Sequence, residues 1–230
     1  MKAISLSVVL SALFVVPAGA ATILVDNFDQ TVPPLSVTNS IDGNFGQDQT
    51  LTGILGTIRS GQVRNYGTPP NNDASTLSTS GSLLNAVRGS GIGDFKLSYF
   101  GGTEVIAGDW NYTGLSDATS LQLTFSGNRT ANLSVSVLAR KWDWGYSNFV
   151  STLSPAQANV PVGDSILDLP LGVLNLASFG GIDEFEIVFS TAENTSFSVD
   201  SIAAVVPEPT SVALCGVVAM ALLARRERRQ

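Results

Sequence analysis

The stretch 120–139, SLQLTFSGNRTANLSVSVLA, alternates apolar and polar residues on both sides of a Gly-Asn pair. From Leu121 to Phe125, and again from Leu133 to Val137, every second residue is Leu, Val or Phe, and those between are Gln, Ser or Thr. Successive side chains of a β-strand point to opposite faces, so each run is expected to bury one face and expose the other. Gly127-Asn128-Arg129-Thr130 is typical of a turn, and we predict that the two strands form a hairpin.

Similar short runs recur between Gly- or Pro-containing turns, at residues 22–28, 83–87, 95–100, 165–169, 184–189 and 196–205. Eight or more short antiparallel strands at this spacing predict an all-β domain over residues 22–205, an antiparallel two-sheet β-sandwich of jelly-roll-like form. The stretch 36–85 has few strand signals and is expected to supply loops and edge strands. Within 184–189, alternation predicts that Glu184 and Glu186 face solvent.

Composition restricts the chemistry of the domain. The chain has no histidine, which excludes Ser-His-Asp and Cys-His nucleophile systems and the usual zinc sites. Its only cysteine, Cys215, lies near the C-terminus, so the domain has no disulfide. Seven basic and 17 acidic residues between positions 22 and 206 give a formal charge of −10, which argues against nucleic acid as a partner.

One enzymatic option survives these exclusions, a pair of carboxylates of the kind that hydrolyses glycosidic bonds. Its candidates are Asp183, Glu184, Glu186 and Asp200. Because Glu184 and Glu186 fit a plain solvent-facing strand pattern, we expect the domain not to be an enzyme.

The N-terminus has the three parts of a secretory signal peptide. Met1-Lys2 supplies positive charge, residues 3–16 are mostly apolar, and Pro17 to Ala21 offers small residues for cleavage. Residues 1–21 are therefore predicted to be a signal peptide that signal peptidase cuts before Ala21 or Thr22.

The C-terminus also has three parts. Val206-Pro207-Glu208-Pro209-Thr210 is held extended by its prolines, and a 13-residue apolar run follows from Val212 to Ala224. That run is shorter than the roughly 20 residues of a permanent membrane span, which suits a temporary transmembrane helix. The terminal arginines, which are costly to move through hydrocarbon, are expected to stay cytoplasmic; they are Arg225, Arg226, Arg228 and Arg229.

In its order and spacing, the segment 206–230 resembles the PEP-CTERM sorting signal. The resemblance implies secretion by a Gram-negative bacterium, a transient stay in the inner membrane and cleavage by an exosortase-like membrane enzyme. The implied destination is the cell surface or extracellular matrix.

The domain itself loosely resembles galactose-binding-like jelly-roll modules. The resemblance rests on an opening strand, Val25-Asp26-Asn27-Phe28-Asp29, and a closing strand, residues 197–202, that is expected to pair near it. Such modules often carry a structural calcium, and carboxylates are calcium ligands. The resemblance thus implies either a calcium site at Asp26, Asp29 and Asp200 or plain solvated carboxylates, with no other cofactor expected.

Aromatic residues gather at one predicted turn, Lys141-Trp142-Asp143-Trp144-Gly145-Tyr146. Two interpretations stay open: Trp142, Trp144 and Tyr146 stack on sugar rings while Asp143 binds hydroxyls, or alternate rings fill the core. We expect an exported envelope or matrix protein with a structural or interaction role linked to exopolysaccharide in biofilm. The alternatives are a carbohydrate-binding module and a polysaccharide-active hydrolase or lyase.

Overall fold

The computed structural model describes residues 20–30, 32–37, 43–50, 58–65, 75–90, 93–100, 115–127, 129–143, 148–151, 155–176 and 182–207. Residues 21–207 form one compact unit. The predicted signal peptide core and the tail after Pro207 lie outside the described residues. In the described part of the chain, no helix is long and apolar enough to cross a membrane.

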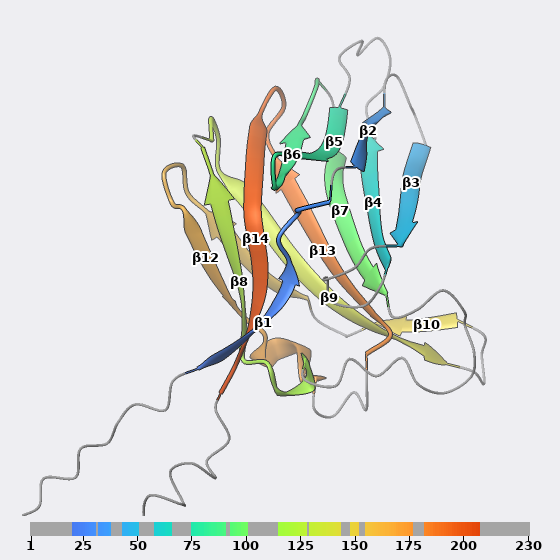
Figure 1. Ribbon diagram of the computed structural model, residues 1–230, viewed down its shortest axis with the longest axis vertical. Coiled ribbons are helices and arrows are strands. Elements are labelled where there is room, and N and C mark those ends of the chain that lie inside the picture. Colours follow the sequence, from blue (N-terminus) through green and yellow to red (C-terminus); the bar gives the residue numbers. More distant parts are fainter. Residues whose placement is uncertain are drawn as a thin grey trace, which may run out of the picture. The chain divides into compact units, whose positions relative to one another are not determined.

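Two antiparallel sheets form a sandwich, as the alternation predicted (Figure 1). Sheet A has the order β12-β8-β14-β6-β5-β2, with β1 also paired to β14. Its strands are β1 (Ala21–Asp26), β2 (Val32–Val37), β5 (Ser75–Ser80), β6 (Leu83–Val87), β8 (Ser120–Ser126), β12 (Ile166–Pro170) and β14 (Ser196–Val206).

Sheet B has the order β10-β9-β13-β7-β4-β3, with β11 also paired to β9. Its strands are β3 (Gly43–Thr50), β4 (Ile58–Asn65), β7 (Gly93–Phe100), β9 (Leu133–Asp143), β10 (Asn148–Ser151), β11 (Ala156–Val160) and β13 (Glu184–Thr191). Two short 3-10 helices, η1 (Leu115–Asp117) and η2 (Gly172–Leu174), lie in the connections.

The inward faces of both sheets form one hydrophobic core. Phe95 and Phe189 of sheet B meet Phe197 of sheet A, with ring centroids 5.7 and 5.3 Å apart. Offset and edge-on ring pairs of this kind stabilise a core beyond the area that they bury. In most strands every second residue enters the core, which is why the sequence pattern located most strands correctly; β13 is buried on both faces.

The predicted hairpin between Leu121–Phe125 and Leu133–Val137 is wrong. β8 pairs with β12 and β14 in sheet A, whereas β9 pairs with β10, β11 and β13 in sheet B. The chain therefore crosses from one sheet to the other between them. Alternation fixes which face of a strand is buried, but two strands that face each other across a core show the same pattern as two strands in one sheet.

The interpretation of residues 36–85 as loops and edge strands is only partly right. β2 and β3 are indeed outermost, but β4 lies between β7 and β3, and β5 lies between β6 and β2. Their sequences, rich in Gly, Ser and Thr, conceal interior strands because few large side chains mark the buried face.

The first and last strands pair, as expected from the sequence. Ala21 lies opposite Val206 and Leu24 opposite Ala203, so the compact unit begins and ends at neighbouring points of sheet A. Figure 1 shows β1 lying alongside β14.

Candidate functional site

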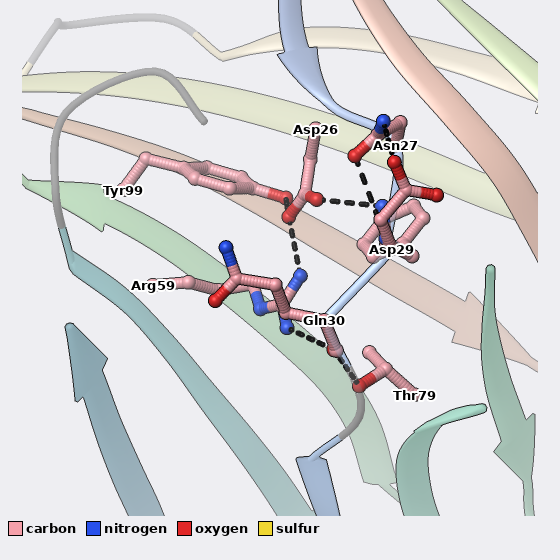
Figure 2. A network of polar contacts seen from close by, with 8 residues as sticks. Asp26, Asn27, Asp29, Gln30, Arg59, Thr79 and Tyr99 are labelled. Carbon is pink, nitrogen blue, oxygen red and sulfur yellow. Dashed lines mark hydrogen bonds and ion pairs between the residues drawn. The ribbon is translucent and has the colours of Figure 1, made fainter. Parts of the chain in front are cut away.

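A carboxylate that is closed to solvent lies at the end of β1. Asp26 Oδ2 accepts hydrogen bonds from Arg59 Nη1 at 2.6 Å and from the Tyr99 hydroxyl at 3.1 Å. Figure 2 shows both side chains pointing toward Asp26, Arg59 from β4 and Tyr99 from β7. All three residues are buried. A buried carboxylate needs such a partner because its charge is otherwise costly to remove from water.

The chain after β1 turns around the same carboxylate. Asp26 Oδ1 accepts from the backbone N–H of Phe28 at 2.8 Å, a short side-chain turn that holds Phe28 at a φ of 55°. This left-handed conformation is unusual for a bulky residue and is retained only where its surroundings enforce it. Here the buried Phe28 ring lies 5.4 Å from the Arg59 guanidinium.

The network also reaches sheet A through the backbone carbonyl of Gln30. The Gln30 carbonyl accepts from Thr79 Oγ1 at 2.7 Å and from Arg59 Nη2 at 3.5 Å (Figure 2). Thr79 belongs to β5 of sheet A, while Arg59 belongs to β4 of sheet B. The network is thus a polar clamp between the two sheets, and Arg59 is the cation at its centre.

The structure does not gather the three predicted calcium ligands into a metal site. Among the described residues, no group of three or more His, Cys, Asp or Glu side chains is arranged to hold a metal. Asp26 is buried against Arg59, Asp29 is exposed and accepts a hydrogen bond from the Asn27 amide, and Asp200 is exposed on β14. The β1–β14 register places Asp26 opposite Ile202, so strand pairing alone does not bring Asp200 to it.

Glu184 and Glu186 are not solvent-facing, contrary to the alternation argument. Each is 3% exposed. Glu186 Oε2 lies 3.0 Å from Lys96 Nζ and 2.9 Å from Arg140 Nη2, and Glu184 Oε2 lies 3.4 Å from Arg140 Nη1. The period of two correctly put both on the face opposite the core, but the outer face of sheet B is itself buried along β7 and β13.

Both glutamates are therefore held in ion pairs with Lys96 and Arg140. Asp183, just before β13, also has a partner, and Asp200 lies in the other sheet. Of the four candidates, Glu184 and Glu186 are brought together, and both contact the Arg140 guanidinium. Ser98, across from Glu186 on β7, is buried, and its hydroxyl has no hydrogen-bond partner in the described part of the chain.

Every basic residue of the domain is engaged. Besides the ion pairs of Arg59, Lys96 and Arg140, Arg64 makes a two-pronged ion pair with Asp94, at 2.5 and 2.7 Å. Lys141 also has an interaction partner.

The two remaining arginines, Arg88 and Arg129, donate hydrogen bonds to backbone carbonyls. Arg88 donates to the Thr191 carbonyl, and Arg129 donates to the carbonyls of Pro161 and Asp164. Burial lowers the pKa of both arginines, and nearby carboxylates oppose this shift, Glu193 and Asp94 for Arg88 and Asp164 for Arg129. Their burial identifies them as internal braces and not as docking charges.

The exposed charges are all acidic. The carboxylates on the described surface belong to Asp29, Asp117, Asp164, Asp168, Glu193 and Asp200. Since the remaining sequence of the domain contains no Lys or Arg, the domain has no uncommitted positive charge.

The aromatic cluster lies at a chain reversal, as predicted. β9 extends through Trp142 to Asp143, and Asn148 of β10 lies opposite Asp143. Trp144 and Tyr146 lie outside the described residues, so the choice between sugar stacking and core filling stays a prediction. The backbone of Trp142 is paired with that of Phe149.

The predicted sorting motif begins where the domain ends. Val206 is the last residue of β14, and Pro207, which has no N–H to donate to a strand partner, follows it directly. Glu208, Pro209, Thr210 and the arginine cluster lie outside the described residues.

No family model matches the chain, and no curated protein matches it. Solved structures show a distant likeness. The family 11 carbohydrate-binding module of the Clostridium thermocellum cellulase Lic26A-Cel5E is 12% identical, with a TM-score of 0.39 over 81% of this chain and 95% of that module.

A mutant of a family 29 carbohydrate-binding module has a TM-score of 0.35 at 10% identity, over 81% of this chain and 92% of that one. An exo-beta-agarase has the same TM-score at 11% identity and covers 83% of this chain, which spans 25% of the enzyme. TM-scores this low give no basis for assigning a ligand.

The alternation argument missed the partners of the buried carboxylates, Arg59, Tyr99, Lys96 and Arg140. One signal was present: the domain has only seven basic residues for 17 acidic ones, and Lys96 and Arg140 lie within or directly after apolar strand patterns. Which carboxylate each would meet depends on strand order, and alternation does not determine that order.

Proposed function

We propose that this chain is an exported, non-catalytic interaction domain of a Gram-negative cell surface or extracellular matrix. An exosortase-like enzyme sorts it and releases it from the inner membrane, and the released domain associates with exopolysaccharide. The alternative is a dedicated carbohydrate-binding module.

The observation that carries the proposal is the match between the compact unit and the two processing signals. The unit runs from Ala21 to Pro207, and its terminal strands pair at Ala21 and Val206. The signal-peptidase cut is predicted before Ala21 or Thr22, and the second cut at or just after Pro207-Glu208-Pro209. Both cuts fall at strand ends, so processing leaves the paired strands essentially whole.

The state of the carboxylates supports a non-catalytic role. Glu184 and Glu186 are occupied by Lys96 and Arg140, and the other acids are dispersed over two sheets. A glycoside hydrolase needs one carboxyl group as a proton donor and a second facing it across the substrate. Glu184 and Glu186 lie close to one another at Arg140, but both are buried in ion pairs, which argues against that role.

The test is the intact mass of the protein recovered from the surface or medium of the producing cell. We expect a species that begins at residue 21 or 22 and ends within residues 207–210. Replacing Pro207-Glu208-Pro209 by three alanines lets helix extend into the cleavage site and should trap full-length protein in the inner membrane. A surface mass that still includes residues 211–230 would identify the tail as a simple anchor and refute the proposal.

A further inference from the structure

The two sheets differ in the accessibility of their outer faces. On sheet B, outward-facing residues of the central strands β4, β7 and β13 are buried: Ser60, Lys96, Ser98, Glu184 and Glu186. Those of β9 are half-buried, and those of β11 include the exposed Gln157 and Asn159. On sheet A, the outward-facing residues of β5, β6, β8, β12 and β14 are half-buried or exposed, apart from Ser120 at the start of β8. Among the described residues, the middle of the outer face of sheet B is therefore closed to a partner, whereas the outer face of sheet A is open across all five of these strands.

The open face of sheet A is rich in hydroxyl and amide groups. We define it by the outward-facing polar residues Ser78, Ser80, Asn85, Gln122, Thr124, Ser126, Ser198 and Ser201. Strand register aligns Ser126, Ser198, Asn85 and Ser78 in one row across four strands. A second row joins Asp168, Gln122, Ala203 and Leu24.

Part of the open face is already ordered by its own hydrogen bonds. Ser198 Oγ donates to Asn85 Oδ1 at 2.8 Å, and Asn85 Nδ2 donates to Ser80 Oγ at 3.2 Å. Side chains that are already ordered lose little conformational entropy when a ligand binds. This favours binding of a polymer to the open face. Leu24, Val87 and Ile166 add separate exposed apolar side chains around the polar rows.

The charges of the domain restrict the partner. All seven basic residues are committed within the fold, and the open face carries only the acidic Asp168 and Asp200. An anionic polymer would meet a domain of net charge −10 with no free cation to pair with it. Hydroxyls and amides are the groups that hydrogen-bond an uncharged, hydroxyl-rich chain.

We therefore propose that the open face of sheet A is the polymer-binding surface and that its ligand is a neutral polysaccharide. This inference rests on the proposed function and names the surface and the ligand class. It places binding away from the Trp142–Tyr146 turn of sheet B.

The experiment uses protein purified from the producing cells and three polymers: a neutral mixed-linkage β-glucan, the anionic alginate and the cationic chitosan. Affinity electrophoresis measures retardation at low and high salt. We expect retention by the glucan alone, with little change as salt rises, because no charge pairs form. Asn85→Ala and Gln122→Ala should each weaken binding about two- to tenfold, the range for loss of one net hydrogen bond.

A matched control is Gln157→Ala, since Gln157 is exposed on β11 of sheet B and its loss should leave binding unchanged. If the glucan binds but only Trp142→Ala or Trp144→Ala weakens it, the open-face inference fails while the proposed function stands. Retention by alginate or chitosan alone, abolished by salt, would overturn the neutral ligand class. Absence of binding to all three polymers would count against both proposals.

Discussion

At the scale of single residues, the domain is organised by a few charges placed out of reach of water. Arg59 neutralises Asp26, accompanies the Phe28 ring and donates to the Gln30 carbonyl. The position where the sequence suggested a metal thus contains a guanidinium supplied by the chain itself. Removing a cation from such a site leaves a buried, unpaired carboxylate, which is more costly than the original pair is stabilising.

Arg59→Met should therefore destabilise the domain by about 3–5 kcal/mol, the usual cost of breaking a buried ion pair from one side. Tyr99→Phe removes only one hydrogen bond to the same carboxylate and should cost about 1.5–3 kcal/mol. Urea unfolding at neutral pH measures both. EDTA should leave the urea-unfolding midpoint of the unmodified protein unchanged. A large fall in that midpoint on chelation would show that a bound metal stabilises the site around Asp26.

At the scale of elements, the distance between the two sheets depends on small residues as well as on large ones. Gly61 of β4 faces the core beside Leu97 of β7, and a β-carbon there would lie 3.3 Å from Leu77 Cδ2 of β5. The glycine thus marks a close contact between sheet B and sheet A. Its backbone conformation needs no glycine, so the constraint is one of space.

We expect Gly61→Ala to be nearly neutral, since Leu77 must shift by only a few tenths of an ångström. Gly61→Val adds two more methyl groups and should cost about 1–3 kcal/mol through overpacking. Combining Gly61→Val with Leu77→Ala should recover part of that loss, giving a favourable coupling in a double-mutant cycle. Strict additivity of the two substitutions would show that Gly61 and Leu77 do not compete for the same space.

The comparison between sequence and structure also belongs at the scale of elements. Runs such as Leu83–Val87 and Glu184–Phe189 were located within a few residues because a half-buried strand has a period of two. The pattern did not identify which strands pair with one another. β8 and β9, expected to form a hairpin, lie in different sheets, and β4 was not recognised as a strand because of its glycine and serine. The pairing of β1 with β14 was correctly expected, but the Arg59 clamp beside it depends on strands brought together from distant parts of the chain.

At the scale of the whole molecule, the domain is stabilised by packing and internal charge pairing, without covalent cross-links. Between residues 22 and 206 there is no cysteine, although the predicted destination is oxidising. The shared core of two seven-stranded sheets is large enough to make such a cross-link unnecessary.

Residues 22–206, expressed without either terminal signal, should accordingly fold as a monomeric β protein whose unfolding midpoint is the same with and without reductant. Far-ultraviolet circular dichroism and size-exclusion chromatography check the secondary structure and the association state. A largely helical spectrum, or folding only when the tail is present, would contradict the domain boundaries proposed above.

The pairing of Ala21 with Val206 also determines how the domain responds to mechanical force. Because β1 and β14 are antiparallel and these ends are neighbours, tension that pulls the two ends apart loads their hydrogen bonds one after another, as in a zipper. A load that enters through the broad side of sheet A is instead shared by many strands at once. The fold is therefore suited to carrying a polymer across its side, and poorly suited to serving as a link in series between two tethers.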